Sequence, residues 1–193
     1  MELFIYWFGD ARVSGADLED TIDDVLNEEG EVTGGGRGDT GGNIDVEIFD
    51  DANVERLMAE IASAVSADLP ANAYYHFAYD EEQHLLRELL PNQPEVPKHL
   101  RAAARGICSG LNSALKAASD GDMPFKCASS MVDGTTVISN LIGRLSVEDA
   151  RERFERWTVG STALMLVQSL KLAGATAWEA HYNGVPIVRM PMI

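Results

Sequence analysis

The sequence is poor in cysteine and in basic residues, and it has no long hydrophobic run. Its 193 residues include two cysteines, Cys108 and Cys127, too few and too far apart for a disulfide scaffold or a zinc knuckle. The opening residues MELFIYWFGD have no basic region before a short apolar run, so we expect no signal peptide. No apolar stretch is long enough to span a bilayer. These absences predict a cytoplasmic protein with reduced thiols.

Positive charge is scarcest in the first third of the chain. Acidic residues number 31 against 15 basic ones, which gives a formal net charge of −16. Residues 1–60 carry 17 Asp and Glu against Arg12, Arg37 and Arg56, a net charge of −14. Such a surface repels nucleic acid and anionic membranes and attracts basic partners. The alternative is a solvated surface that only maintains solubility.

Residues 1–80 alternate between strand-like and helix-like patterns. The strand segments are 2–8, 31–33, 43–48 and 73–79, and the helical segments are 14–30 and 50–65. We expect Ser14 to cap the first helix and Gly30 to end it. The order strand, helix, strand, strand, helix, strand is that of the ferredoxin-like, or split βαβ, arrangement.

The remaining residues have a different character. Three prolines in 81–97 indicate a linker or an irregular crossing. Residues 98–193 are expected to be mainly helical, with a short strand over 123–131 and a division between two helices at Gly160. The dipeptide Asn183-Gly184 between two apolar runs predicts a terminal β-hairpin. The fold class that follows is α+β.

The glycine-rich stretch at 34–42 carries two motif spellings. Gly36-x-Gly38-x-x-Gly41 has the spacing of a dinucleotide-binding loop, but that loop needs a helix after it, and a strand follows here. Its neighbours Asp39 and Asp45 would also repel a phosphate. Arg37-Gly38-Asp39 spells an integrin ligand, yet nothing in the sequence directs export. We therefore interpret the stretch as a glycine-rich turn between two strands.

Candidate catalytic and metal-binding groups have simpler interpretations. The carboxylates of 45, 47, 50 and 51 could bind Mg²⁺ or Ca²⁺, but they form no EF-hand pattern, and they occupy outward strand positions or a helix start. Cys108 lies in GICSG, which resembles a nucleophile elbow, but a helical run precedes it where that motif needs a strand. The sequence thus predicts no catalytic residue, no metal ligand and no cofactor.

The run GEVTGGGRGDTGGNIDVEIFDD, which follows an acidic amphipathic helix, resembles a segment of bacterial immunity proteins, which are encoded beside polymorphic secreted toxins. The resemblance covers about the first sixty residues and rests on Val-Thr-Gly-Gly-Gly and Asn-Ile-Asp-Val-Glu. It implies a cytosolic protein that binds and blocks a toxin domain without catalysis. No resemblance is identified for residues 81–193.

Our functional hypothesis is a non-catalytic interaction protein that neutralises a basic partner. The expected partner-binding residues are Arg37, Asp39, Asp45, Glu47, Asp50 and Asp51. One alternative is an enzyme with a site between the two halves, suggested by Tyr74, Tyr75, His76 and Tyr79. Another is a regulatory module that binds a small ligand. The oligomeric state is left open.

Overall fold

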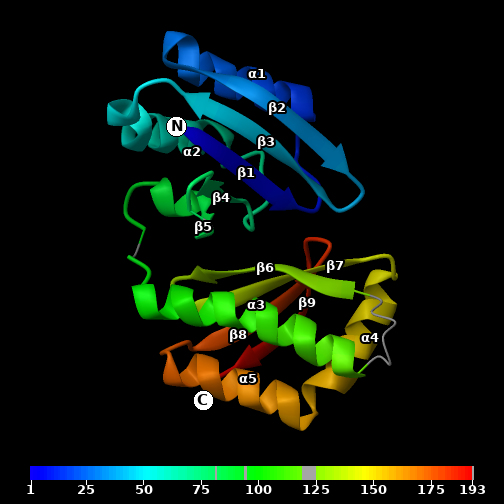
Figure 1. The fold of residues 1–193 in the computed structure, drawn as a ribbon. Helices are drawn as coiled ribbons and strands as arrows, with labels where there is room; N and C mark the ends of the chain where they lie inside the picture. Colours follow the sequence, from blue (N-terminus) through cyan, green and yellow to red (C-terminus); the bar gives the residue numbers. More distant parts are fainter. Residues whose placement is uncertain (81, 94, 119–124, 193) are drawn as a thin grey trace. The chain divides into compact units, whose positions relative to one another are not determined.

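The chain forms two compact units, unit 1 (Met1–Pro94) and unit 2 (Glu95–Ile193), each combining a β-sheet with helices (Figure 1). The computed structural model describes residues 1–80, 82–93, 95–118 and 125–192. The predicted α+β class is confirmed, because both units contain helices and a sheet. No helix within these described ranges is long and apolar enough to cross a membrane.

Unit 1 is built on a five-stranded sheet whose paired strands are all antiparallel. Along the chain its elements are β1 (Glu2–Phe8), α1 (Gly15–Leu26), β2 (Gly30–Gly38), β3 (Gly41–Ile48), α2 (Val54–Val65), β4 (Tyr74–Phe77) and β5 (His84–Leu85). In space the strands follow the order β2-β3-β1-β4-β5. The first strand of the chain is therefore central, and β2 lies at an edge.

The core of unit 1 lies between one sheet face and the two helices. Alternate residues of β1 (Leu3, Ile5, Trp7) and of β3 (Ile44, Val46, Ile48) are buried there. Helices α1 and α2 supply the apolar stripes that cover them, including Leu18, Ile22, Leu57 and Ile61. This burial fixes which strand residues point away from the helices, because side chains alternate along a strand.

Helix α1 begins as its sequence predicts and ends differently. Ser14 is the N-cap, and its hydroxyl accepts a hydrogen bond from the amide of Asp17. The prediction that Gly30 ends the helix is wrong. Asn27, with a positive φ of 51°, is the C-cap after Leu26, and Gly30 begins β2 with extended backbone. Glycine is required at 30 for another reason, since a Cβ would meet the Glu47 carbonyl oxygen at 2.5 Å.

The glycine-rich stretch is strand rather than an extended turn. Glycines at 34, 35, 36 and 38 pair with β3, and Asp39-Thr40 alone forms the reversal. The predicted hairpin is present. Its turn is shorter than expected, because the glycine backbone pairs with β3 as the backbone of any other residue would. Gly42 must lack a side chain, because a Cβ would lie 2.4 Å from the Trp7 ring and 2.7 Å from the Gly36 carbonyl oxygen.

Part of the segment that the sequence predicts to be a linker or an irregular crossing packs on unit 1. Residues 84–85 form β5, and Leu86–Leu89 form a short 3-10 helix. Leu86 is buried in the core of unit 1, and Leu89 and Leu90 pack against that core. Val96 belongs to the core of unit 2.

Unit 2 contains a four-stranded sheet as well as three helices. Its elements are α3 (Lys98–Ala118), β6 (Phe125–Asp133), β7 (Thr136–Gly143), α4 (Val147–Thr158), α5 (Ser161–Leu172), β8 (Ala177–Tyr182) and β9 (Val185–Pro191). The strand order is β6-β7-β8-β9, with β7 and β8 parallel. The expectation of a mainly helical region missed β7, because a short apolar run does not distinguish a strand from a helix by its period.

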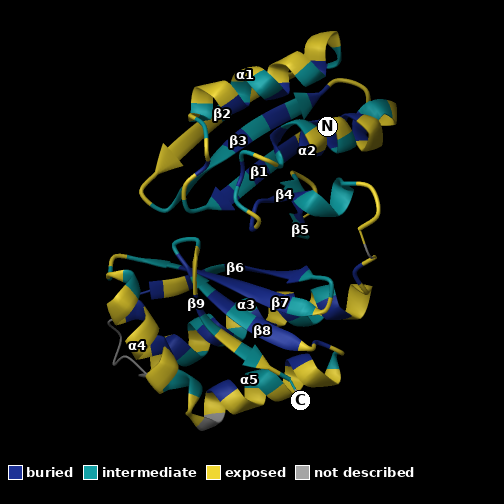
Figure 2. Ribbon diagram, turned by 180° about the vertical axis from the view of Figure 1, so that it is seen from behind, coloured by how far each residue is buried: buried dark blue, intermediate teal, exposed yellow. Residues whose placement is uncertain are grey.

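Other local predictions in unit 2 agree with the structure. Gly160 separates α4 from α5, and Asn183 and Gly184, both with positive φ, form the turn between β8 and β9. Of the predicted strand 123–131, residues 125–131 lie in β6, while 123 and 124 lie outside the described residues. Helices α3, α4 and α5 cover one sheet face, and their outer sides are exposed (Figure 2).

Candidate functional site

Strand β3 places its acidic residues on the sheet face opposite the helices of unit 1. Ile44, Val46 and Ile48 point into the core, so Asp45 and Glu47 point away from it. Both are half-buried. The sequence predicts this alternation from the pattern Ile-Asp-Val-Glu-Ile, and the structure has it.

Strand register adds two further glutamates that sequence reasoning missed. Glu47 lies opposite Glu31 of β2 on one side and opposite Glu2 of β1 on the other. We call Glu2, Glu31, Asp45 and Glu47 the acidic face. Among the described residues none of these four carboxylates forms an ion pair. Like charges directly opposite each other on neighbouring strands destabilise a sheet, so this row has an energetic cost.

Asp45 lies beside aromatic side chains. It pairs in register with Phe4 of β1, which pairs in turn with His76 of β4. The Asp45 carboxylate accepts a 2.8 Å hydrogen bond from the side-chain amide of Asn43. Burial, and after it the negative charge of Asp45, raise the pKa of Tyr6 on the same face. Among the described residues this carboxylate therefore has one neutral hydrogen-bond donor and no ion-pair partner.

The predicted partner-binding residues do not form one cluster. Arg37 alternates to the helix side of the sheet, where its guanidinium lies 3.1 Å from Asp10 Oδ1 and 3.4 Å from the carbonyl oxygen of Val13. Asp39 is exposed in the turn after β2. Neither residue belongs to the acidic face.

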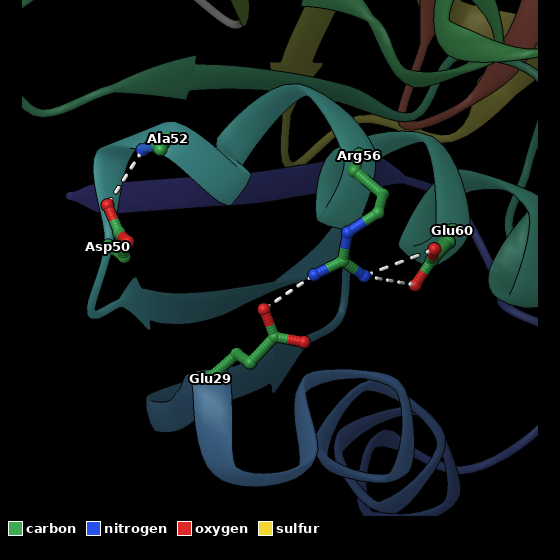
Figure 3. Close-up of polar contacts among 5 residues, drawn as sticks. All are labelled: Glu29, Asp50, Ala52, Arg56 and Glu60. Carbon is green, nitrogen blue, oxygen red and sulfur yellow. Dashed lines mark hydrogen bonds and ion pairs between the residues drawn. The ribbon is translucent and has the colours of Figure 1, made fainter.

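Asp50 and Asp51 lie at the start of a 3-10 helix (Asp51–Asn53) that precedes α2. The Asp50 carboxylate accepts a 2.9 Å hydrogen bond from the Ala52 amide (Figure 3). Asp51 Oδ1 lies 3.6 Å from the amino group of Met1. The sequence places the start of the second α-helix at these aspartates, whereas α2 begins three residues later, and Asp50 caps the 3-10 helix instead.

Arg56 is already engaged by two acids. Figure 3 shows its guanidinium between Glu29, at 2.5 Å, and Glu60, at 3.1 Å. These hydrogen bonds, first the one with Glu29, raise the pKa of Arg56. The cation is therefore compensated locally and does not offset the acidic face.

The two cysteines of unit 2 lie on neighbouring elements, Cys108 on α3 and Cys127 on β6. Cys108 Sγ lies 3.5 Å from the Cys127 carbonyl oxygen, and Cys127 Sγ lies 3.2 Å from the Ser129 carbonyl oxygen. A hydrogen bond from the Cys127 thiol, against the opposing effect of burial, lowers the pKa of Cys108. The pKa of Cys127 is raised, first by its hydrogen bond with Cys108 and then by burial. Cys108 lies within a helix, so the strand that a nucleophile elbow requires is absent from the described residues before it.

The tyrosine and histidine residues of β4 divide between the two faces of the sheet. His76 shares a face with Tyr6, and their rings stack with centroids 5.7 Å apart. Tyr75 alternates to the other face and stacks on His84 at 5.3 Å. His76 Nδ1 lies 3.2 Å from the Phe77 carbonyl oxygen. Glu81, which follows this segment in the sequence, lies outside the described residues.

A histidine in unit 2 has a carboxylate partner that the sequence did not indicate. His181 Nε2 lies 3.0 Å from Glu179 Oε2, and Arg189 Nη1 lies 3.4 Å from Glu179 Oε1. The i, i+2 spacing on β8 and the pairing of Glu179 with Arg189 in the hairpin bring these groups together. A histidine held by a carboxylate can act as a base, although no nucleophile accompanies it among the contacts of the described residues.

Unit 1 also contains an open cavity of about 450 Å³. It is bordered by the β1–α1 loop, the α2–β4 loop and the 3-10 helix after β5. Arg12, Arg87, Asp10 and Asp68 supply charge, and Leu69, Leu86 and Leu90 supply apolar wall. His76 is not among its lining residues. The described residues contain no group of three or more His, Cys, Asp or Glu placed to hold a metal ion.

Comparisons with known proteins found no matching protein family, no matching curated protein and no matching solved structure.

Proposed function

We propose that this chain is a non-catalytic interaction protein that inhibits a basic protein by binding it through the acidic face. The observation that carries the proposal is the row Glu31, Glu47 and Glu2, three carboxylates side by side on adjacent strands with no ion-pair partner among the described residues. A row that costs stability is expected where a positively charged partner compensates it.

The proposed mechanism is occlusion. The negative field of unit 1 accelerates encounter with a basic surface, and the bound protein then blocks that surface. The resemblance of the glycine-rich hairpin and acidic helix to immunity proteins supports a toxin domain as the partner. The pair of free cysteines supports a cytoplasmic location, where thiols stay reduced.

The scaffold that we propose for this face is ferredoxin-like. Support comes from the chain order β1-α1-β2-β3-α2-β4 and from the spatial order β2-β3-β1-β4, with both helices packed on one face. Strand β5 extends that arrangement at its edge. The scaffold leaves the opposite face to the acidic residues.

A charge-reversal experiment tests the proposal. Affinity capture from the native host with mass spectrometry identifies the basic partner, and stopped-flow kinetics then measure its association rate against NaCl concentration. The variant D45K/E47K should lower that rate by about tenfold or more and flatten its salt dependence. The control E148K/E155K, on α4, changes the net charge equally. An unchanged rate in D45K/E47K, or recovery of no basic protein, would contradict the proposal.

The cavity of unit 1 favours a second candidate function, the binding of a small ligand. Its walls combine two arginines and two aspartates with leucine side chains, and an arginine beside the leucines suits a short-chain carboxylate. Thermal-shift assays with butyrate and hexanoate test this candidate. A rise in melting temperature that the R12A variant abolishes would support it, and an unchanged melting temperature would remove it.

A further inference from the structure

The outermost strand of unit 1 presents open backbone at the edge of the sheet. Strand β2 pairs with β3 on one side, and no described strand pairs with it on the other. It is nine residues long, whereas β5 at the opposite edge has two. Residues 35–38 are exposed, and Figure 2 shows this end of β2 in yellow.

The pairing pattern identifies which backbone groups face the open edge. In an antiparallel pair, alternate residues direct their N–H and C=O groups toward the neighbouring strand, and the residues between direct theirs outward. The two-residue turn makes Gly38 and Gly41 a bonded pair, so Gly36 also faces β3. Gly35 and Arg37 therefore direct their backbone groups to the open edge.

One end of β2 is protected and the other is not. The Val32 amide, which also points outward, donates a 2.9 Å hydrogen bond to the Asp23 carboxylate of α1. A bulge between Val32 and Gly34 then separates this end from the glycine run. Natural edge strands are usually blocked by proline, lysine, a bulge or short length. Of these devices β2 has only the bulge after Val32, which leaves residues 34–38 open.

We propose that residues 34–38 accept an extended segment of a basic partner as a sixth strand of the sheet. Main-chain hydrogen bonds to Gly35 and Arg37 would hold that segment, and glycine leaves no side chain in its way. This inference rests on the proposed function and names how the partner binds.

The charge around β2 indicates which kind of segment would bind at this edge. Helix α1, which packs along β2, carries five acids and no lysine or arginine: Asp17, Glu19, Asp20, Asp23 and Asp24. The Arg37 side chain is turned back to Asp10. A second copy of this chain would place acid against acid across the new strand pair. A segment with lysine or arginine at alternate positions is complementary to the α1 acids.

A capped hexapeptide of alternating lysine and valine is the probe, and NMR of the full chain labelled with ¹⁵N is the readout. We expect hydrogen exchange at the Gly35 and Arg37 amides to slow on binding. Exchange at Gly36, whose amide already faces β3, should change less. A glutamate–valine peptide of equal length should not bind.

The matched variants are R37P and R37A. Both remove the side chain and its contact with Asp10, but only proline removes the outward N–H group, and proline is tolerated on edge strands. R37P should bind the lysine–valine peptide about tenfold or more weakly than R37A. Far-UV circular dichroism and the NMR signal of Trp7 report whether each variant is folded.

The outcomes separate the two proposals. Equal affinities of folded R37P and R37A, or no slowing at Gly35 and Arg37, would overturn strand addition. If D45K/E47K then still slowed association with the native partner, binding through the acidic face would be supported without strand addition. Loss of peptide binding in R37P together with an unaltered partner rate in D45K/E47K would support the edge and contradict the acidic face.

Discussion

Glu31 of β2 lies directly opposite Glu47 of β3. Because Glu47 also faces Glu2 of β1, three carboxylates form one row across the sheet, with no ion pair to any described cation. The row is therefore the part of the sheet where stability and the proposed function are most directly opposed.

The first prediction concerns the cost of this row of glutamates to the stability of the protein. E47K should stabilise the protein, by about 0.2–1 kcal/mol, because a lysine between two glutamates replaces repulsion with attraction. Urea unfolding at low salt measures the change, and added NaCl should reduce it. The control E55K makes the same substitution at an exposed position of α2. A destabilised E47K, or an equal gain in E55K, would contradict this account of the row.

The second prediction concerns the start of α1. The Ser14 hydroxyl, and then its backbone amide, donate to Asp17 Oδ2 at 2.6 and 3.1 Å and lower the pKa of Asp17. Since the folded pKa lies below the unfolded one, this contribution to stability is present above the unfolded pKa. It is lost as the pH falls through the folded pKa.

Replacement of Ser14 by alanine tests that contribution. S14A should raise the pKa of Asp17 toward its ordinary value and lower the melting temperature by a few degrees at neutral pH. NMR titration of the Asp17 carboxyl and thermal unfolding at several pH values measure both effects. The difference in melting temperature between wild type and S14A should narrow in acid, and a constant difference would argue against the capping role of Asp17.

The third prediction compares two glycines of one hairpin. G42A should destabilise the protein by about 1–3 kcal/mol, because its Cβ would meet the Trp7 ring at 2.4 Å. G38A is the matched control, since a Cβ there has nothing within 4 Å. Urea unfolding followed by tryptophan fluorescence compares them. Equal stabilities would show that the packing of Trp7 against β3 is not as described.

The fourth prediction concerns thiol reactivity. Cys108 is half-buried with a lowered pKa, whereas Cys127 is buried with a raised one. Iodoacetamide should therefore modify Cys108 first, with a rate midpoint below the ordinary thiol pKa. In C127A the midpoint should move upward, because the hydrogen bond that stabilises the Cys108 thiolate is removed. Mass spectrometry of timed samples measures this, and faster modification of Cys127 would contradict the geometry.

Several features followed from the sequence because their causes are local. Ser14 caps α1, Gly160 separates two helices, and Asn183-Gly184 turns the last hairpin. Each depends on the conformational preference or hydrogen bonding of residues within a few positions. The outward placement of Asp45 and Glu47 is similarly local, since it requires only that a strand alternates.

Other features could not be predicted from neighbouring residues in the sequence. The glycines of β2 have low strand propensity, and they are strand because β3 pairs with each of them. β7 is a short apolar run, and its hydrophobic pattern fits a strand and a helix equally well. Arg37 and Asp39 are adjacent to the acidic strand in sequence, yet strand alternation turns Arg37 to the helix side.

By itself the sequence determined the class of the fold, the caps and turns, and the concentration of negative charge in the first sixty residues. Tertiary structure alone decided that Glu2, Glu31 and Glu47 form one row and that the glycine run is an open edge. The physical reason is register: which residues of distant strands lie opposite each other is set by the packing of whole strands, and no single segment specifies it.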